Sequence, residues 1–177
     1  REVLAAPTSE LVRGLASRMP ADLRMGTSSW SFPGWKDVVW QGEHGEQKLS
    51  RQGLRAYAGH PLLRTVGVDR SHYAPVSRDL LLGYARQVPS DFSFLVKAHE
   101  ACTLAAFPNH PRYGQAKGQV NPLFFDAAYA SEMVVAPFVE GLGEQGGVLL
   151  FQFAAQPLAQ LGGNARAFAD KLFRFLS

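Results

Sequence analysis

Short apolar runs alternate along the chain with stretches in which apolar residues recur every three or four positions. The short runs contain many strand-forming residues and predict strands at residues 23–29, 63–69, 92–98 and 148–153. Strands that alternate with helices are typical of βαβ units, in which crossover helices connect the parallel strands of one sheet. The pattern therefore predicts four parallel strands, adjacent in sequence order, with helices packed outside them.

The helical spacing predicts one helix before the first strand and one after each strand. The leading helix covers residues 8–19, and Thr8 or Ser9 is expected to cap it. The helices that follow the strands are predicted at residues 49–58, 76–87, 122–142 and 165–176.

Residues that start or interrupt helices define the last two of these elements. Asn121 is expected to cap the helix at 122–142, with Pro122 as its first residue, because proline is well tolerated there. Pro137 is expected to kink or divide the same helix, since it cannot donate a backbone hydrogen bond. Asn164 is expected to cap the final helix.

The composition is that of a folded globular domain. The chain has 177 residues, of which 46% are apolar and 19% are charged. A complete (β/α)8 barrel typically requires ~250 residues, so the length is short for one. No run approaches the ~20 apolar residues of a membrane span, and residues 1–20 lack the continuous apolar core of a signal peptide. We expect one domain with no membrane contact, preceded by an extension at residues 1–20.

Cys102 is the only cysteine of the chain. It cannot form an internal disulfide, and a zinc site made of thiolates is excluded, so a reducing cytoplasm is the expected compartment. The net charge of +3 permits contact with phosphate groups without requiring it. Neither a metal nor a cofactor is expected from the residue pattern.

Four segments carry more specific information than the periodicity. They read GTSSWSFPGW at 26–35, VGVDRSHYAP at 66–75, DFSFLVKA at 91–98 and VLLFQF at 148–153. In order and spacing they resemble the signature segments of the YecE-like family (domain of unknown function 72), whose biochemical function is not established. The resemblance covers roughly residues 24–177. It implies a TIM-type (β/α)8 barrel, of which residues 21–177 would form only the first four βα units.

The chain departs from the family pattern at several positions. Ser29 stands where the family usually has glycine, and Gly67 stands where it usually has glutamate. His99 replaces a proline, and Ala154 and Ala155 replace a proline pair. If the family has a chemistry that needs the glutamate of the second strand, this chain lacks that acid, because Gly67 occupies the position. Asp69 lies two residues further on and shares the same strand face, so it is the candidate replacement.

In a (β/α)8 barrel the active site lies at the carboxyl ends of the strands, and this rule selects a short set of residues. The candidates for catalysis are Asp69, His72, Lys97 and His99. The candidates for ligand binding are Ser28, Trp30, Trp35, Arg70, Tyr73 and Gln152. This mixture of hydroxyl, aromatic, basic and acidic groups suits a polar ligand of phosphate or sugar character.

Each catalytic candidate also has an ordinary structural interpretation. Lys97 is an electrophile, a phosphate ligand or a Schiff-base nucleophile, or else the partner of Asp69 or Glu100 in an ion pair. Asp69 is a general base or phosphate-orienting group, or a turn or cap residue. His72 and His99 form an acid–base pair or part of a metal site, or one caps a loop and the other is half-exposed.

The binding candidates have similar alternatives. Trp30 and Trp35 stack on a base or sugar, or else they plug the barrel mouth or pack beneath the loop that carries them. Arg70 contacts phosphate or is solvated, and the hydroxyl of Tyr73 needs a partner if the ring is buried.

Two classes of function fit this site. The first is an enzyme, a phosphodiesterase-like hydrolase acting on a phosphate-containing or nucleic-acid-derived ligand, although no motif of a named enzyme class is present. The second is a non-catalytic barrel that binds a nucleic acid or a metabolite. Convergence of Asp69, His72, Lys97 and His99 on one pocket would favour the enzyme, whereas scattered side chains would favour binding.

Half a barrel would leave two open sheet edges and an uncovered apolar inner face. Either the natural protein continues past Ser177 with four more βα units, or two copies pair their open faces. A C-terminal half or a second copy is therefore an expected partner, beside a small phosphorylated ligand or nucleic acid.

Overall fold

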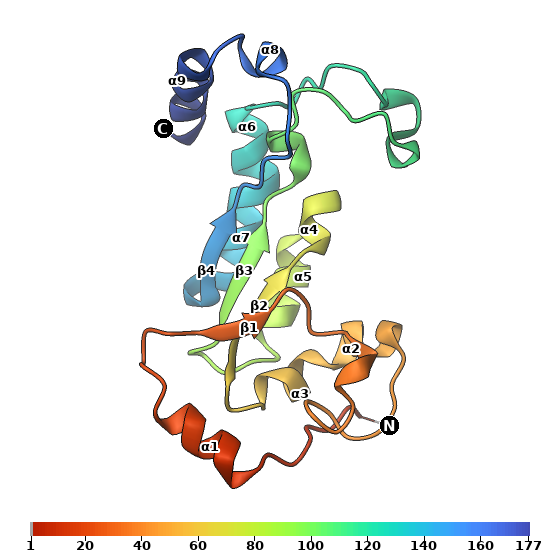
Figure 1. Cartoon of the computed structure of the whole chain (residues 1–177), viewed down its shortest axis with the longest axis vertical. Coiled ribbons are helices and arrows are strands. Elements are labelled where there is room, and N and C mark those ends of the chain that lie inside the picture. The colour runs from red at the N-terminus through yellow and green to blue at the C-terminus, as the bar shows by residue number, and fades with distance from the viewer. Residues whose placement is uncertain (1) are drawn as a thin grey trace.

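The computed structural model describes residues 2–177 and contains one parallel sheet with helices between its strands (Figure 1). The strands are β1 (Met25–Thr27), β2 (Leu63–Val68), β3 (Ser93–Lys97) and β4 (Gly146–Leu150), and they lie in the order β1-β2-β3-β4. Each neighbouring pair is parallel. The prediction of four parallel strands, adjacent in sequence order, is confirmed.

The strands are shorter than predicted, because a strand extends only as far as its neighbour supplies hydrogen bonds. The edge strand β1 pairs with β2 over three residues, so the ends of the run at 23–29 are not in the ladder. Strand β4 pairs with β3 from Gly146 to Leu150, and residues 151–153 continue the chain outside the sheet.

The α-helices are α1 (Glu10–Ser17), α2 (Glu46–Gln52), α3 (Leu54–Ala58), α4 (Arg70–Tyr73), α5 (Arg78–Ala85), α6 (Ala127–Ala130), α7 (Ala136–Leu142), α8 (Leu158–Leu161) and α9 (Ala165–Leu176). Two predicted caps are confirmed. The hydroxyl of Ser9 accepts from the backbone N–H of Val12, and Oδ1 of Asn164 accepts from that of Ala167. Within residues 2–177, every helix is too short or too polar to span a bilayer.

The helix predicted at 122–142 begins later than expected, and the assignment of Asn121 as its cap is wrong. Asn121 is buried, and its Nδ2 donates to the carbonyl oxygens of Ala101 and Leu104, each at 2.7 Å. With this side chain bound to the preceding loop, residues 122–125 form turns and Asp126 caps α6 instead. The predicted division occurs as a π-helical turn, Ser131–Val135, just before Pro137.

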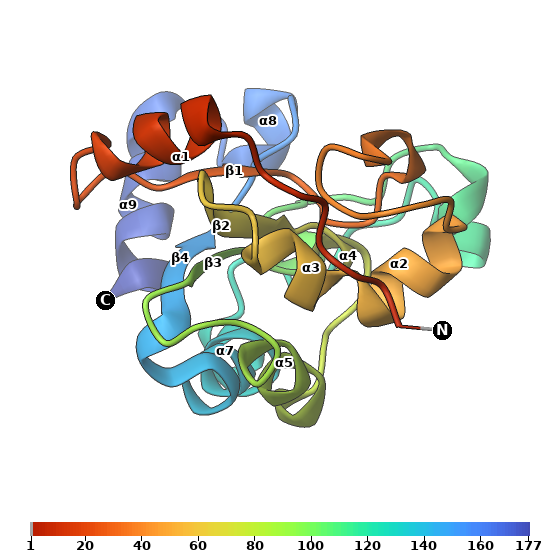
Figure 2. The same cartoon turned by 90° about the horizontal axis from the view of Figure 1, so that it is seen from below.

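Helices α5 and α7 pack together on one face of the sheet (Figures 1 and 2). The side chains that β2 and β3 bury in the core are those of Val66, Val68, Phe94 and Val96. The other face carries the alternate positions, which on β3 and β4 are Leu95, Lys97, Val148 and Leu150. Val148 and Leu150 are exposed, so this face remains apolar and partly open to solvent.

Candidate functional site

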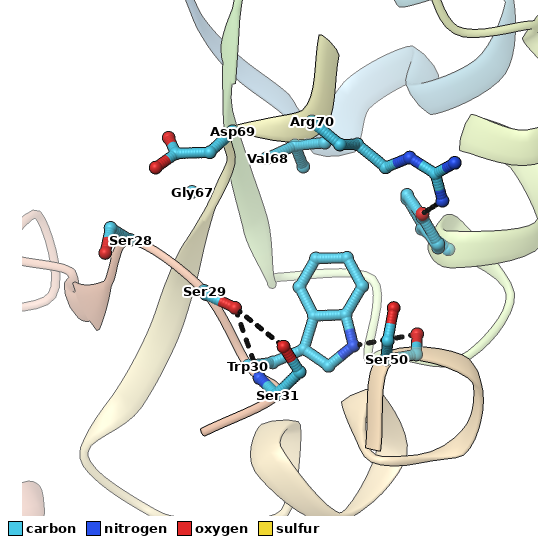
Figure 3. A pocket seen from close by; sticks show the side chains of 10 residues that line it. Ser28, Ser29, Trp30, Ser31, Ser50, Gly67, Val68, Asp69 and Arg70 are labelled. Atoms are coloured by element: carbon cyan, nitrogen blue, oxygen red, sulfur yellow. Dashed lines mark hydrogen bonds between the residues drawn. The ribbon is translucent and has the colours of Figure 1, made fainter. Parts of the chain in front are cut away.

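The carboxyl ends of the four parallel strands meet at one edge of the sheet. A cavity of about 120 Å³ lies there beside the ends of β1 and β2 (Figure 3). It is lined by Ser28, Ser29, Trp30, Ser31, Ser50, Gly67, Val68, Asp69, Arg70 and Tyr84. Parallel pairing has therefore brought together two sequence segments that lie about forty residues apart.

Backbone and hydroxyl groups shape one side of this cavity. Thr27 Oγ1 donates to the carbonyl oxygen of Ser29 at 2.7 Å, and Ser29 Oγ accepts from the backbone N–H of Ser31 at 3.2 Å. These bonds fix the turn that follows β1. The structure gives the Ser28 hydroxyl no hydrogen bond to any of residues 2–177, so it is available to a ligand.

Gly67 lies in the wall of the cavity, where the family usually has glutamate. A Cβ at this position would lie 2.9 Å from the carbonyl oxygen and 3.0 Å from the Cα of Ser28. The end of β1 therefore occupies the space that a side chain would need. Asp69 supplies the only carboxylate among the residues that line this cavity.

Asp69 and Lys97 form an ion pair, with 3.1 Å between Oδ1 and Nζ. Asp69 precedes α4, but its side chain makes no capping hydrogen bond. The pair retains solvent contact, with exposed fractions of 40% and 24%, so it contributes little stability by itself. Lys97 thus pairs with one of its two expected partners, and its ammonium group lies beside the one carboxylate that lines the cavity.

Arg70 extends in the opposite direction from Asp69, as Figure 3 shows. Its guanidinium donates to the hydroxyl of Tyr84 at 3.3 Å, and the side chain is otherwise exposed. It forms the second wall of the cavity, across from Ser28 and Asp69.

The two histidines have different partners. His72 Nε2 lies 3.6 Å from Oε2 of Glu100, and Nδ1 lies 3.4 Å from the carbonyl oxygen of Ala98. His99 Nδ1 lies 2.7 Å from the hydroxyl of Tyr129, and burial lowers the pKa of His99, which favours its neutral form. The four catalytic candidates are thus divided among three separate pairs. Among residues 2–177, no three side chains of histidine, cysteine, aspartate or glutamate gather as a metal site.

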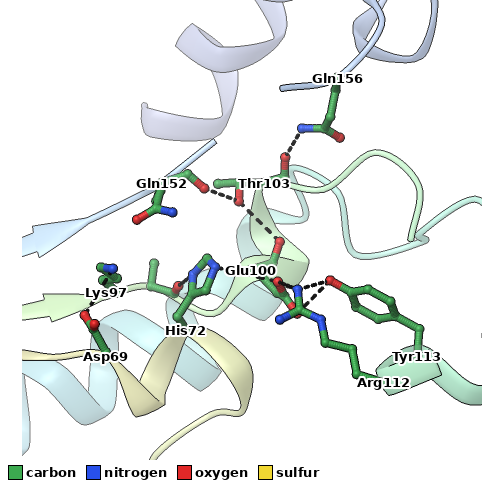
Figure 4. A network of polar contacts seen from close by, with 10 residues as sticks. Asp69, His72, Lys97, Glu100, Thr103, Arg112, Tyr113, Gln152 and Gln156 are labelled. Atoms are coloured by element: carbon green, nitrogen blue, oxygen red, sulfur yellow. Dashed lines mark hydrogen bonds and ion pairs between the residues drawn. The ribbon is translucent and has the colours of Figure 1, made fainter. Parts of the chain in front are cut away.

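Glu100, which the sequence offered only as a partner for Lys97, is the centre of a polar network with Arg112 and Tyr113 (Figure 4). Its side chain is 9% exposed, and Oε2 accepts from Nη2 of Arg112 at 2.6 Å. Oε1 accepts from the hydroxyl of Tyr113 at 3.1 Å, and Arg112 also bonds to that hydroxyl. An acid within the largely apolar segment AHEACTLAA indicates a buried charge. Its partner, Arg112, lies twelve residues away and could be identified only from the folded structure.

Gln152 contributes through its backbone, whose carbonyl oxygen accepts from Thr103 Oγ1 at 2.8 Å. Its side chain is exposed at the same edge. Gln156 ties the segment after β4 to the loop after β3, because its amide bonds to the backbone of Ala105 and of Thr103.

The aromatic candidates separate into packed and exposed rings. Trp30 is buried, and its Nε1 donates to the carbonyl oxygen of Ser50 at 3.2 Å. Trp35 is half-buried against Trp40. Tyr73, by contrast, exposes 61% of its surface. Of these three candidates, Tyr73 therefore has by far the most exposed side chain.

Cys102 is fully buried, and burial raises the pKa of its thiol to about 11. The thiol is therefore protonated at pH 8, and only the thiolate reacts readily with electrophiles. We expect the native protein to react slowly with Ellman's reagent at this pH and to release one equivalent of thiol on unfolding in guanidinium. Fast stoichiometric reaction of the native protein would contradict the buried position of Cys102.

These observations define an α/β protein with a four-stranded parallel sheet and a polar carboxyl edge. The chain belongs to the family described as proteins of unknown function DUF72, whose sequence model matches residues 24–176. The family indicated by the four sequence segments is thereby confirmed. No curated protein matches the chain.

The fold is similar to that of a DUF72 family protein from Enterococcus faecalis. One crystal structure of that protein matches with a TM-score of 0.50 and 18% identity, over 86% of this chain and 46% of that one. A second crystal structure of it matches with a TM-score of 0.39 and 19% identity, over 69% and 43%. The chain thus spans less than half the length of that protein, and the first match shows a likeness of fold.

Proposed function

We propose that the chain forms the first half of a (β/α)8 barrel and binds a phosphate-bearing ligand at the carboxyl edge of its strands. The observation that carries this proposal is the cavity lined on one side by the Ser28 hydroxyl and Asp69 and on the other by Arg70, with Lys97 joined to it through Asp69. Lysine and arginine side chains with a hydroxyl group are an ordinary set of partners for phosphate oxygens.

The barrel is supported by the strand order. Doubly wound open sheets reverse their order at a switch point, whereas a barrel adds each strand beside the one before it. The four strands here are added in this consecutive way. In a closed barrel the alternate face, with Leu95, Val148 and Leu150, would be internal and covered. Residues 21–177 would then form the half-barrel, and further chain or a second copy would complete it.

Binding is better supported than hydrolysis by the arrangement of the titratable groups. A hydrolase needs an acid or base within hydrogen-bond reach of one reacting position. Asp69, His72 and His99 instead engage three different partners, and the carboxylate of Glu100 is occupied by Arg112 and Tyr113. We therefore assign a binding role to the carboxyl edge of the sheet. Hydrolysis is the alternative, and it would need catalytic residues in addition to these.

The substitution Lys97→Met tests the proposed phosphate contact. We expect the dissociation constant for ribose 5-phosphate to rise about 10- to 100-fold, because one charged hydrogen bond is lost. The free energy of unfolding should change by less than ~1 kcal/mol, since the ion pair with Asp69 is partly exposed. Calorimetric titration and urea unfolding measure the two quantities.

Lys36→Met is the matched control, because Lys36 also pairs with a carboxylate, at 2.9 Å from Glu43, but outside the cavity. It should leave the affinity unchanged. An unfolded Lys97→Met protein would show that the ion pair is structural, and unchanged affinity in that variant would exclude Lys97 as a phosphate ligand.

A further inference from the structure

An exposed aromatic ring stands one helical turn from the proposed phosphate site. Tyr73 is the last residue of α4, the short helix that begins at Arg70 directly after Asp69. Residues three apart on a helix are neighbours on its surface, and four residues rise by about 6 Å. The backbone of Tyr73 thus lies about 6 Å along the helix axis from that of Asp69, which is of the order of one nucleotide unit.

The ring of Tyr73 belongs to a stack that holds it in place. The guanidinium carbon of Arg112 lies 5.2 Å from the centre of the Tyr73 ring and 4.5 Å from that of Tyr113. His72 meets Tyr73 edge-on at 5.2 Å. Because Glu100 fixes Arg112, the stack is ordered before any ligand arrives.

The loop is already anchored by Glu100 through Arg112 and Tyr113, so the anchoring does not need an aromatic ring at position 73. The structure gives the Tyr73 hydroxyl no hydrogen bond within residues 2–177, and the residue exposes 61% of its surface. An amphipathic ring held rigid and open in this way is the usual form of a stacking partner for a nucleic acid base.

The segment that supplies Arg112 carries an excess of basic over acidic residues. Residues 101–125 include Arg112 and Lys117 and contain no aspartate or glutamate. The acid nearest the stack, Glu100, is buried and paired. The groups in contact with Tyr73 thus include a basic and an aromatic residue of this segment, Arg112 and, through it, Tyr113, which is the combination found in single-stranded nucleic acid sites.

We infer that Tyr73, held by Arg112 and Tyr113, is the stacking surface for the base of a nucleotide unit whose phosphate occupies the proposed site. This inference rests on the proposed phosphate binding and narrows the ligand class from any phosphate compound to a nucleotide. The unit is either a free nucleotide or part of a single-stranded nucleic acid, because both present the same base and phosphate.

The test compares ligands with and without a base. Adenosine monophosphate, a single-stranded hexanucleotide and ribose 5-phosphate are titrated into the protein and into Tyr73→Leu and Tyr73→Phe. We expect adenosine monophosphate to bind at least about fivefold more tightly than ribose 5-phosphate. Tyr73→Leu should remove this difference, and Tyr73→Phe should retain it. Phe173→Leu, which removes a ring that is 73% exposed on α9, is the control and should change nothing.

The outcomes separate the two proposals. If ribose 5-phosphate binds as tightly as adenosine monophosphate and Tyr73→Leu affects neither, the stacking surface is refuted and phosphate binding stands. If none of the three compounds binds, both proposals fail. If the hexanucleotide binds more tightly than the mononucleotide, with the same loss in Tyr73→Leu, the natural source is a nucleic acid, whereas equal affinities identify a free nucleotide.

Discussion

Replacement of Gly141 by alanine is expected to lower the free energy of unfolding by about 1–3 kcal/mol, the common cost of overpacking a core. A Cβ at this position would lie 2.7 Å from the Cβ of Leu81 and 2.8 Å from the carbonyl oxygen of Arg78. Both atoms are on or next to the backbone of α5, so neither can turn aside. Helix α7 would have to move away from α5, and this loss exceeds the ~1 kcal/mol by which alanine favours a helix over glycine.

Gly83→Ala is the matched control, since Gly83, like Gly141, lies in the last turn of a helix of this pair. No atom lies within 4 Å of a Cβ built at this position. This variant should therefore be more stable than the parent by about 0.5–1 kcal/mol. Urea unfolding followed by circular dichroism measures both variants. Stabilisation by both substitutions would show that α5 and α7 are not in the close contact described here.

Arg112→Met is expected to destabilise the protein by about 3 kcal/mol, because it removes the cation that neutralises a buried carboxylate. Glu100 is only 9% exposed at its side chain and would retain the hydroxyl of Tyr113 and the more distant His72. Removal of the charge from the other partner, in Glu100→Gln, should cost less stability. In Glu100→Gln the released Arg112, whose side chain is 40% exposed, regains contact with water.

The double variant Arg112→Met with Glu100→Gln should be more stable than Arg112→Met alone, because no buried charge is left without a partner. Urea unfolding of the three variants at pH 8 gives the comparison. Limited proteolysis of the loop at residues 104–121 reports whether its attachment to β3 is lost. Equal costs for the two single substitutions would mean that Glu100 is in contact with water in the native protein.

Local features of the sequence determined the kinds of elements and their order. The alternation of strands and helices depends on periodicities that each segment carries by itself. Ser9 and Asn164 could be predicted as caps because each bonds to a backbone N–H three residues away. Likewise, Asp69 and Lys97 were predicted at one edge, since every strand of a parallel sheet ends on the same side.

Which side chains meet at that edge was decided only by the tertiary structure. The sequence offered several partners for Lys97 and an acid–base pair of His72 and His99. The fold instead pairs Lys97 with Asp69 and gives the two histidines separate partners. These pairings depend on how far each strand extends relative to its neighbour in the sheet. No local sequence pattern specifies that relation.

The same reason explains the residues that sequence reasoning misplaced. Asparagine is a common helix-capping residue, yet the side-chain amide of Asn121 donates to carbonyl groups seventeen and twenty residues earlier in the chain. Trp30 and Tyr73 are both aromatic residues after a strand, but one is buried and the other open. Periodicity and capping are set by neighbours within a turn or two of the chain, whereas burial and ion pairing are set by groups that only the folded chain brings into contact.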